Sequence, residues 1–249
     1  MIINLLRNSL TINQQKKSLS SFTGKNIFSS KEVFDFIKEQ SPDLKKSTIN
    51  WKIYKLVNEG VLQHISRGVY AISAKKEYTP EIPLALKILS NKIKNQFPNS
   101  NFCIWETKYF NHFSVHQLFK NLIIIEVEKD SIESVFFSLK VKNKKIFLNP
   151  DRKIFDNYIN YEQEVIIIKT LISESPLRII DDVPTPTLEK GLVDLMGEKI
   201  ILASLQGEIE NIYAEANNRY SINTNRLRRY ALRRGILEKV EPYIQQFTT

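Results

Sequence analysis

The sequence predicts an α+β fold in two domains: a winged helix-turn-helix over residues 1–78, and a mixed α/β domain with a helical C-terminal part over residues 79–249. Three observations lead to this fold class. A helical stripe near residue 50 ends at a glycine and is followed at once by a short hairpin pattern. Apolar runs of strand length then alternate with helical segments, and from Pro186 onward the spacing is helical. A chain of 249 residues is long enough for two separate cores.

The first observation is the stretch from Thr48 to Ile72, "TINWKIYKLVNEGVLQHISRGVYAI". At about 100° per residue, its apolar side chains Ile49, Ile53, Leu56 and Val57 fall on one helical face. Ser47 is placed to cap the start of this helix, and Gly60 is placed for a left-handed cap at its end. The runs "VLQHI" and "GVYAI" then predict two strands, with Gly68 supplying the positive φ of a tight turn.

Upstream, "SSKEVFDFIKEQSP" predicts a preceding helix with Val33, Phe34 and Ile37 as its apolar stripe. Ser29 or Ser30 caps its start, Pro42 lies beyond its end, and "SPDLKKS" forms the turn between the two helices. This order of helix, turn, helix and hairpin is that of a winged helix-turn-helix. In this interpretation the helix over residues 46–59 enters the major groove of DNA, and Arg67 in the hairpin turn reaches phosphate or the minor groove.

The face opposite the apolar stripe is polar and basic, yet it also carries two large aromatic side chains where solvent is expected, which indicates that something covers them. The predicted DNA-binding residues are Lys45, Lys46, Ser47, Thr48, Asn50, Trp51, Lys52, Tyr54, Lys55 and Arg67.

The charge distribution supports a nucleic-acid partner for the first domain. Residues 1–78 contain 13 Lys and Arg against 6 Asp and Glu, a net charge of +7, whereas the remaining 171 residues have a net charge of +2. Neutralisation of phosphates by Lys and Arg is the main sequence-independent contribution to DNA affinity. Two alternatives stay open: a lysine-rich, solvated surface without a ligand, and a winged helix that binds only protein.

In the second domain, polar residues and prolines over 73–83 mark the boundary, and a helix is predicted over residues 81–97 with Leu84, Ile88 and Ile93 among its apolar positions. The runs "NFCIW", "LIIIEVE", "KKIFLN" and "VIIIKTL" predict strands covered on both faces, and "SVHQLFKN" and "SIESVFFSLK" predict helices. Pro186 is expected in the first turn of the helix "LEKGLVDLM", and a longer helix is expected over residues 199–219.

The C-terminal stretch "SINTNRLRRYALRRG" predicts an arginine-rich helix. Six of the ten arginines of the chain lie within residues 219–234, and Leu227, Tyr230 and Ala231 form its narrow apolar stripe. Arginine makes planar, bidentate contacts with carboxylates and phosphates, so the cluster predicts a docking face for an acidic protein or a nucleic acid. The alternative is a solvated helix paired with Glu208, Glu210 or Glu238. The predicted partner-binding residues are Arg226, Arg228, Arg229, Arg233 and Arg234.

Signatures of other functional classes are weak or missing. The single Cys103 excludes an internal disulfide, no apolar run approaches a membrane span, and no signal peptide is visible, so a cytoplasmic location is expected. His112 and His116 have the spacing of two metal ligands on a helix, but no third ligand follows them. "NPD" at 149–151 and "EVEK" at 126–129 occur in the reverse of the usual nuclease order. We therefore predict no cofactor, no metal site and no enzymatic activity, with a metal-dependent nuclease as the alternative.

The order of these segments also resembles a known family. "STINWKIYKLVNEGVLQHISRGVYAI", the α/β part, "PTPTLEKGLVDLM" and "NRLRRYALRRG" together resemble the AbiEi-type antitoxins of type IV toxin–antitoxin systems, which are also found as phage-abortive-infection regulators. The segment ending in "RGVY" is the strongest element, and "LEKGLVDL" resembles the family's "E(K/R)…L.D" helix. The resemblance implies a winged helix that represses its own promoter and a C-terminal domain that counters a nucleotidyltransferase toxin. This chain differs in carrying about 20 extra residues before "NIFSSKEV".

Overall fold

The computed structural model describes Leu19 and residues 27–58, 60–73, 75–116, 118, 121–141, 145–159 and 164–247, apart from the side chains of Asn58 and His64. These residues form two compact units. The first contains the described residues up to Tyr78 together with the segment Asn217–Asn225, and the second contains Thr79–Ala216 and the chain from Arg226 on. The predicted division at residue 78 assigned Asn217–Asn225 to the other domain. The extra residues before "NIFSSKEV", except Leu19, lie outside the described residues.

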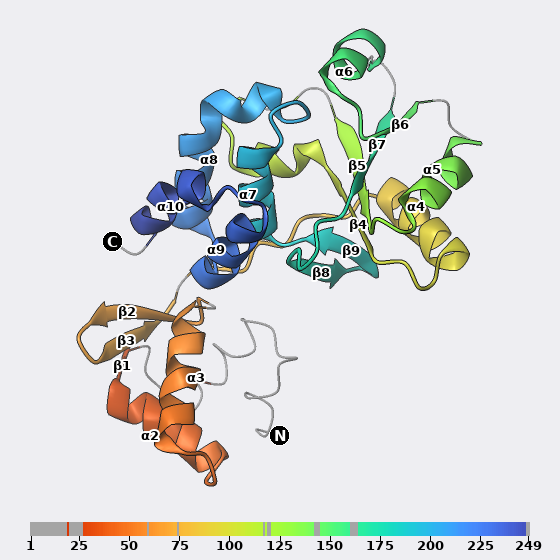
Figure 1. Cartoon of the computed structure of the whole chain (residues 1–249). Helices are drawn as coiled ribbons and strands as arrows, with labels where there is room; N and C mark the ends of the chain where they lie inside the picture. Colours follow the sequence, from red (N-terminus) through yellow and green to blue (C-terminus); the bar gives the residue numbers. More distant parts are fainter. Residues whose placement is uncertain are drawn as a thin grey trace. The chain divides into compact units, whose positions relative to one another are not determined.

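The first unit consists of a small sheet and two helices. Strand β1 (Ile27–Ser29) leads into helices α2 (Ser30–Gln40) and α3 (Lys46–Asn58), which are followed by β2 (Leu62–Ser66) and β3 (Val69–Ile72). The strands form an antiparallel sheet in the order β1-β3-β2. Both helices pack on it (Figure 1), and their apolar residues join those of the sheet in one core.

Local capping explains where the two helices begin and end. Ser29 caps α2, because its hydroxyl accepts a hydrogen bond from the Glu32 amide while the Glu32 carboxylate accepts one from the Ser29 amide. Gly60, at φ +69°, ends α3: its amide donates to the Val57 carbonyl, and the next amide donates to the carbonyl of Leu56. The cap expected at Ser47 is wrong, because α3 begins at Lys46 and Ser47 is its second residue.

The second unit is built on a mixed four-stranded sheet in the order β4-β5-β7-β6. Strands β5, β7 and β6 are parallel, and β4 is antiparallel to β5. Residues Leu122–Val127 of β5 are all buried, as are the first four of β7, which confirms that these strands are covered on both faces. The elements of this unit up to the two-stranded β8-β9 sheet are, in chain order, α4 (Leu84–Gln96), β4 (Phe102–Glu106), the 3-10 helix η1 (Thr107–His112), β5 (Leu122–Val127), α5 (Ile132–Lys140), β6 (Ile146–Leu148), α6 (Arg152–Tyr158), β7 (Val165–Thr170), β8 (Leu177–Ile180) and β9 (Val183–Pro186).

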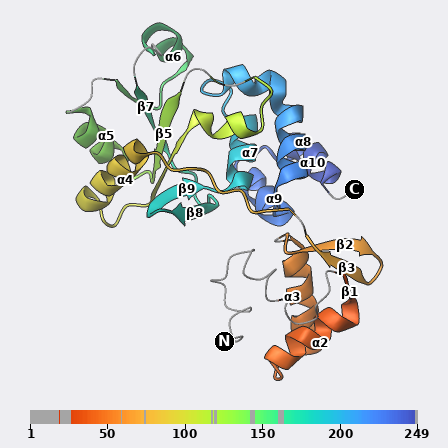
Figure 2. The same cartoon turned by 180° about the vertical axis from the view of Figure 1, so that it is seen from behind.

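Helices cover the two faces of this sheet. Alternate residues such as Ile123 and Ile125 face a core formed with α4 and α5, which lie on one side of the sheet in both Figure 1 and Figure 2. Helix α7 (Leu188–Gly197) lies on the other side, with the 3-10 helix η2 (Ala203–Glu208) and helices α8 (Ile209–Arg219), α9 (Thr224–Arg233) and α10 (Leu237–Gln246) after it. The chain therefore has an α+β fold with a helical C-terminal part.

Several predicted elements differ from the structure. The helix expected over residues 114–121 is absent from its described residues; a 3-10 helix lies just before it. Pro186 ends strand β9, and Thr187 caps α7 instead. Leu84 and Ile88 of α4 are exposed, whereas Ile93 is buried as predicted. The long helix over 199–219 is replaced by η2 and the shorter α8. In the described part of the chain, no helix is both long and apolar enough to cross a bilayer.

Candidate functional site

The outward face of α3 presents the side chains that the sequence assigns to DNA contact. Ile49, Ile53 and Leu56 are buried, so the helix is anchored by the predicted apolar stripe. Trp51 and Tyr54 are 58% and 57% exposed within this structure. The remaining predicted residues are exposed at Lys45, Lys46, Ser47 and Asn50 and half-buried at Thr48, Lys52 and Lys55.

The cations of α3 lie close enough to influence one another. The pKa of Lys52 is lowered, first by partial burial and then by the positive charge of Lys55. The Lys55 ammonium lies 5.7 Å from the centroid of the Trp51 ring, so the aromatic side chain supports a cation on this surface. Such a concentration of positive charge attracts an anionic ligand.

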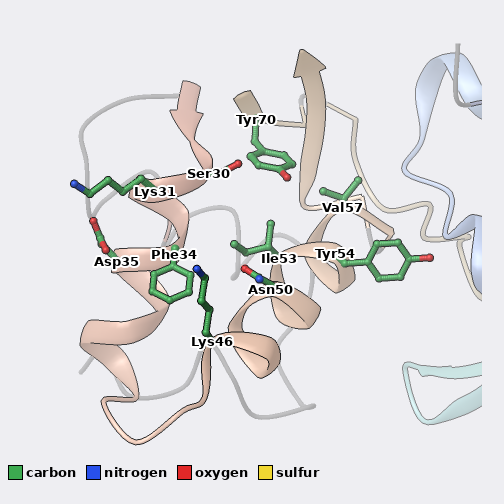
Figure 3. Close-up of a pocket in the computed structure, with 10 residues that line it drawn as sticks. All are labelled: Ser30, Lys31, Phe34, Asp35, Lys46, Asn50, Ile53, Tyr54, Val57 and Tyr70. Atoms are coloured by element: carbon green, nitrogen blue, oxygen red, sulfur yellow. The ribbon is translucent and has the colours of Figure 1, made fainter. Parts of the chain in front are cut away.

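A groove of about 840 Å³ runs between α2, α3 and β3 (Figure 3). Its lining includes the apolar side chains of Phe34, Ile53 and Val57. Lys46 and Asn50 also line it, so a predicted phosphate-contacting residue and the predicted base-contacting residue share this groove. The complete lining is Ser30, Lys31, Phe34, Asp35, Lys46, Asn50, Ile53, Tyr54, Val57 and Tyr70.

The hairpin turn lies beside the beginning of α2. The Ser30 amide donates a 2.7 Å hydrogen bond to the carbonyl of Gly68, whose φ is +75° as the turn requires. Arg67, adjacent to that glycine, is exposed. The turn therefore holds a cation within the same unit as the exposed face of α3.

The arginines of α9, which the sequence assigns to a partner, differ in the contacts that they make within the chain. Arg228 forms a bidentate pair with Glu241 at 2.8 and 3.1 Å, and Arg226 lies 3.5 Å from Glu189. Arg233 donates a 2.8 Å hydrogen bond from Nε to the hydroxyl of Ser173. The apolar stripe of Leu227, Tyr230 and Ala231 is buried as predicted, and Arg229 is exposed.

Arg234 differs from the other arginines because it belongs to a buried network of alternating charges. Its guanidinium hydrogen-bonds both Asp194 and Glu198, and Glu198 also pairs with Lys169. The Arg234 side chain is only 13% exposed, and both of its carboxylate partners belong to the same chain. Its place is structural: it links the end of α9 to α7.

Lys190 lies at the centre of this network. It is fully buried and contacts Glu126 of β5 at 2.6 and 2.8 Å as well as Asp194, one turn along α7. The hydroxyl of Tyr230 donates to Asp194, and the indole of Trp105 donates to Glu126, each at 2.9 Å. Lys190 and Asp194 have the i, i+4 spacing of a helical ion pair, with only Gly191, Leu192 and Val193 between them, and this signal was not used in the sequence analysis.

The pKa shifts follow from these contacts. Burial alone lowers the pKa of Lys190, but the charges of Asp194 and Glu126 outweigh it and leave that pKa well above its usual range. Burial raises the pKa of Asp194, but Lys190 and Arg234 reverse the effect and lower it. Both groups are held in their charged forms. A cavity of about 200 Å³ adjoins the network, lined by Trp105, Ile124, Glu126, Asn149, Lys169, Thr170, Ile172, Asp194, Glu198, Ile201 and Arg234.

The residues of the nuclease alternative and of the two-histidine metal pair do not assemble around this cavity. Asp151 caps α6 and Glu128 hydrogen-bonds Asn101 at 3.0 Å, and neither is among its lining residues. His116 is not on a helix with His112; its ring lies 2.8 Å from Glu208. Among the described residues, His, Cys, Asp and Glu form no group of three or more that could hold a metal ion.

Comparisons with known proteins identify one family. The model of the "Family of unknown function (DUF6577)" matches residues 48–249. No curated protein matches the chain. Among solved structures, the crystal structure of the RV2827C protein from Mycobacterium tuberculosis is similar to 96% of this chain and 81% of that chain, with 12% sequence identity and a TM-score of 0.31. Because the family model covers more than half of its length, the chain belongs to the family DUF6577.

Proposed function

We propose that the chain is a sequence-specific, double-stranded-DNA-binding transcriptional regulator and that its first unit is a winged helix-turn-helix. The observation that carries this proposal is the outward face of α3, where exposed lysines, Asn50 and two aromatic side chains stand on a helix anchored by a buried apolar stripe. The sheet order β1-β3-β2, with the hairpin directly after α3, supports the same motif.

In this proposal α3 lies in the major groove. Asn50 is the base-reading residue, because an asparagine amide can form two hydrogen bonds with adenine in that groove. Lys45, Lys46, Lys52 and Lys55 contact phosphates and set the register of the helix. Arg67, at the hairpin turn, contacts phosphate or the minor groove.

The regulator acts as an AbiEi-like antitoxin that represses its own promoter and counters a nucleotidyltransferase toxin. The resemblance of the sequence to AbiEi-type antitoxins supports this part of the proposal. Arg228, Arg229 and Arg233 on α9 are assigned to the toxin, and Arg234 is left out because its contacts are internal. In this proposal the chain is not an enzyme, and it acts in the cytoplasm, where its promoter and the toxin are found.

Paired substitutions test the DNA-reading assignment. Asn50→Ala should reduce discrimination between the upstream region of the gene and an unrelated duplex by roughly 1–3 kcal/mol, the usual contribution of one base contact. Arg67→Ala should weaken binding to both duplexes about equally. Asn95→Ala, an exposed asparagine on helix α4 of the second unit, is the matched control and should leave both affinities unchanged. Equal losses from Asn50→Ala on both duplexes would place the base-reading face elsewhere.

Two other functions receive less support. A metal-dependent nuclease needs Asp151, Glu126, Glu128 and a lysine around one cavity, and neither Asp151 nor Glu128 lines the cavity beside Glu126. A winged helix that binds only protein remains the alternative for the first unit. A shift assay at several salt concentrations separates it from the proposed function, because phosphate contacts make DNA affinity strongly salt-dependent.

A further inference from the structure

The segment Asn217–Asn225 belongs to the first unit although it lies more than 130 residues beyond the rest of that unit. We infer that this segment completes the DNA-reading surface and that Asn225 is the residue that positions Tyr54 for DNA. The inference rests on the proposed function. It adds Asn225, a residue that local sequence patterns do not assign to DNA binding.

The segment is hydrogen-bonded to Lys75 and Lys76, which follow strand β3. The Ser221 amide donates a 2.8 Å hydrogen bond to the Lys76 carbonyl, and the Ser221 hydroxyl donates to the Lys75 carbonyl at 3.0 Å. The rings of Tyr220 and Tyr78 meet edge to face with centroids 5.0 Å apart. Ser221 is buried, so these contacts are part of the packed interior of the unit.

The same segment contacts the end of α3. The Ser221 hydroxyl lies 3.2 Å from the carbonyl of Gly60, the residue that ends the helix. A Cβ atom on Gly60 would lie only 2.6 Å from the Cβ of Ser221, so the close approach requires glycine there in addition to its positive φ. The C-terminal end of the proposed reading helix is therefore held against Ser221.

Asn225 extends this support to the exposed face of α3. Its side-chain amide donates a 3.2 Å hydrogen bond to the hydroxyl of Tyr54. Tyr54 is 57% exposed, and an exposed tyrosine ring can adopt several orientations. Fixing one orientation before DNA arrives reduces the entropy lost on binding, and it favours the DNA sequence that fits this orientation. Asn225 thus acts through Tyr54 and need not touch DNA itself.

The test compares full-length variants on two duplexes of equal length, the upstream region of the gene and an unrelated sequence, at one salt concentration. Asn225→Ala should weaken binding to the upstream duplex about fivefold, about 1 kcal/mol, and change binding to the unrelated duplex less than twofold. The double variant Asn225→Ala with Tyr54→Phe should bind the upstream duplex no more weakly than Tyr54→Phe alone, because the two side chains act through one hydrogen bond. Asn218→Ala, an exposed asparagine in the same segment, is the matched control and should have no effect.

The outcomes separate this inference from the proposed function. If the wild-type chain discriminates between the duplexes and Asn225→Ala behaves like Asn218→Ala, or if the losses of Asn225→Ala and Tyr54→Phe multiply, the positioning role is wrong and the proposed function stands. Equal weakening of both duplexes by Asn225→Ala would show general destabilisation and would also overturn it. A wild-type chain that binds neither duplex at low salt overturns the proposed function and this role together. This holds even if urea unfolding of the wild type, Asn225→Ala, Tyr54→Phe and the double variant shows that the two side chains are energetically coupled.

Discussion

Replacing Lys190 by methionine should destabilise the second unit by about 3–5 kcal/mol, the usual cost of breaking a buried ion pair by removing one partner. The Lys190 side chain is fully buried and makes two contacts with Glu126 and one with Asp194. After its removal Asp194 keeps Arg234 and Tyr230, whereas Glu126 keeps hydrogen bonds with the Trp105 indole and the Cys103 thiol, neither of which is a cation. The cost therefore comes mainly from one buried carboxylate without a cation.

Urea unfolding at pH 7 measures this loss if the signal reports on the second unit alone. The chain has two tryptophans, so Trp51→Phe leaves Trp105, which hydrogen-bonds Glu126, as the only fluorescent indole. In that background Lys190→Met should lower the midpoint without changing the slope. Adding Glu126→Gln removes the uncompensated charge while keeping an acceptor for the indole, and it should recover part of the loss.

An exposed lysine of the same unit provides the control. Lys153→Met on α6 should change the unfolding free energy by less than about 0.5 kcal/mol, as surface substitutions usually do. A loss below about 1 kcal/mol for Lys190→Met, or no recovery with Glu126→Gln, would refute the reasoning that the network is held together by this lysine.

Three further predictions concern pH, the end of α3 and the arginines of α9. Asp194 and Glu198 have lowered pKa values in the folded chain. The stability that they contribute is therefore present above their unfolded pKa values of 3.8 and 4.5 and is lost as pH falls through the lower folded values; a urea midpoint of the second unit that is unchanged between pH 6 and pH 3 would contradict this. Gly60→Ala should lower thermal stability more than Gly235→Ala, since both have positive φ but only Gly60 faces Ser221, and equal melting temperatures would argue against that contact. Changing Arg228, Arg229 and Arg233 together to alanine should abolish protection against the cognate toxin and leave promoter affinity within about threefold, under about 1 kcal/mol; surviving protection with a tenfold loss of DNA affinity would make α9 a DNA contact.

Local signals explain why most of the first unit could be predicted. Ser29 with Glu32 begins α2, Gly60 ends α3, and Gly68 closes the hairpin, and each of these acts within a few residues. The sequence placed Phe34 in the apolar stripe of α2, but Phe36 is the buried residue and Phe34 is only partly buried. The two positions lie near opposite edges of the same stripe, so helical spacing alone does not distinguish them.

Longer-range packing explains what the sequence did not reveal. The α4 sequence "LALKILSNKIKNQ" has apolar residues on more than one face, and only the sheet decides that Leu86 and Ile93 are buried while Leu84 and Ile88 are exposed. The β8-β9 hairpin was missed because prolines such as Pro186 are rare inside strands.

The site residues follow the same distinction. The exposed face of α3 could be laid out from helical spacing alone. The spacing of Lys190 and Asp194 is also local, but Glu126 is 64 residues away from Lys190 in sequence, and Arg234 is 40 away from Asp194. Asn225 and Tyr54 are separated by 171 residues, so only the folded chain brings them together.

The affinity of the full-length chain for a duplex of its own upstream region, measured from low to physiological salt, tests the proposed DNA-binding function most directly. The logarithm of the association constant should fall linearly with the logarithm of salt concentration, with a slope of about −4 to −5 if each of the five cations neutralises one phosphate. Arg67→Ala should make the slope less steep by about one. Absence of binding at low salt, or an affinity that does not depend on salt, would contradict DNA binding by this surface. The five cations are Lys45, Lys46, Lys52, Lys55 and Arg67.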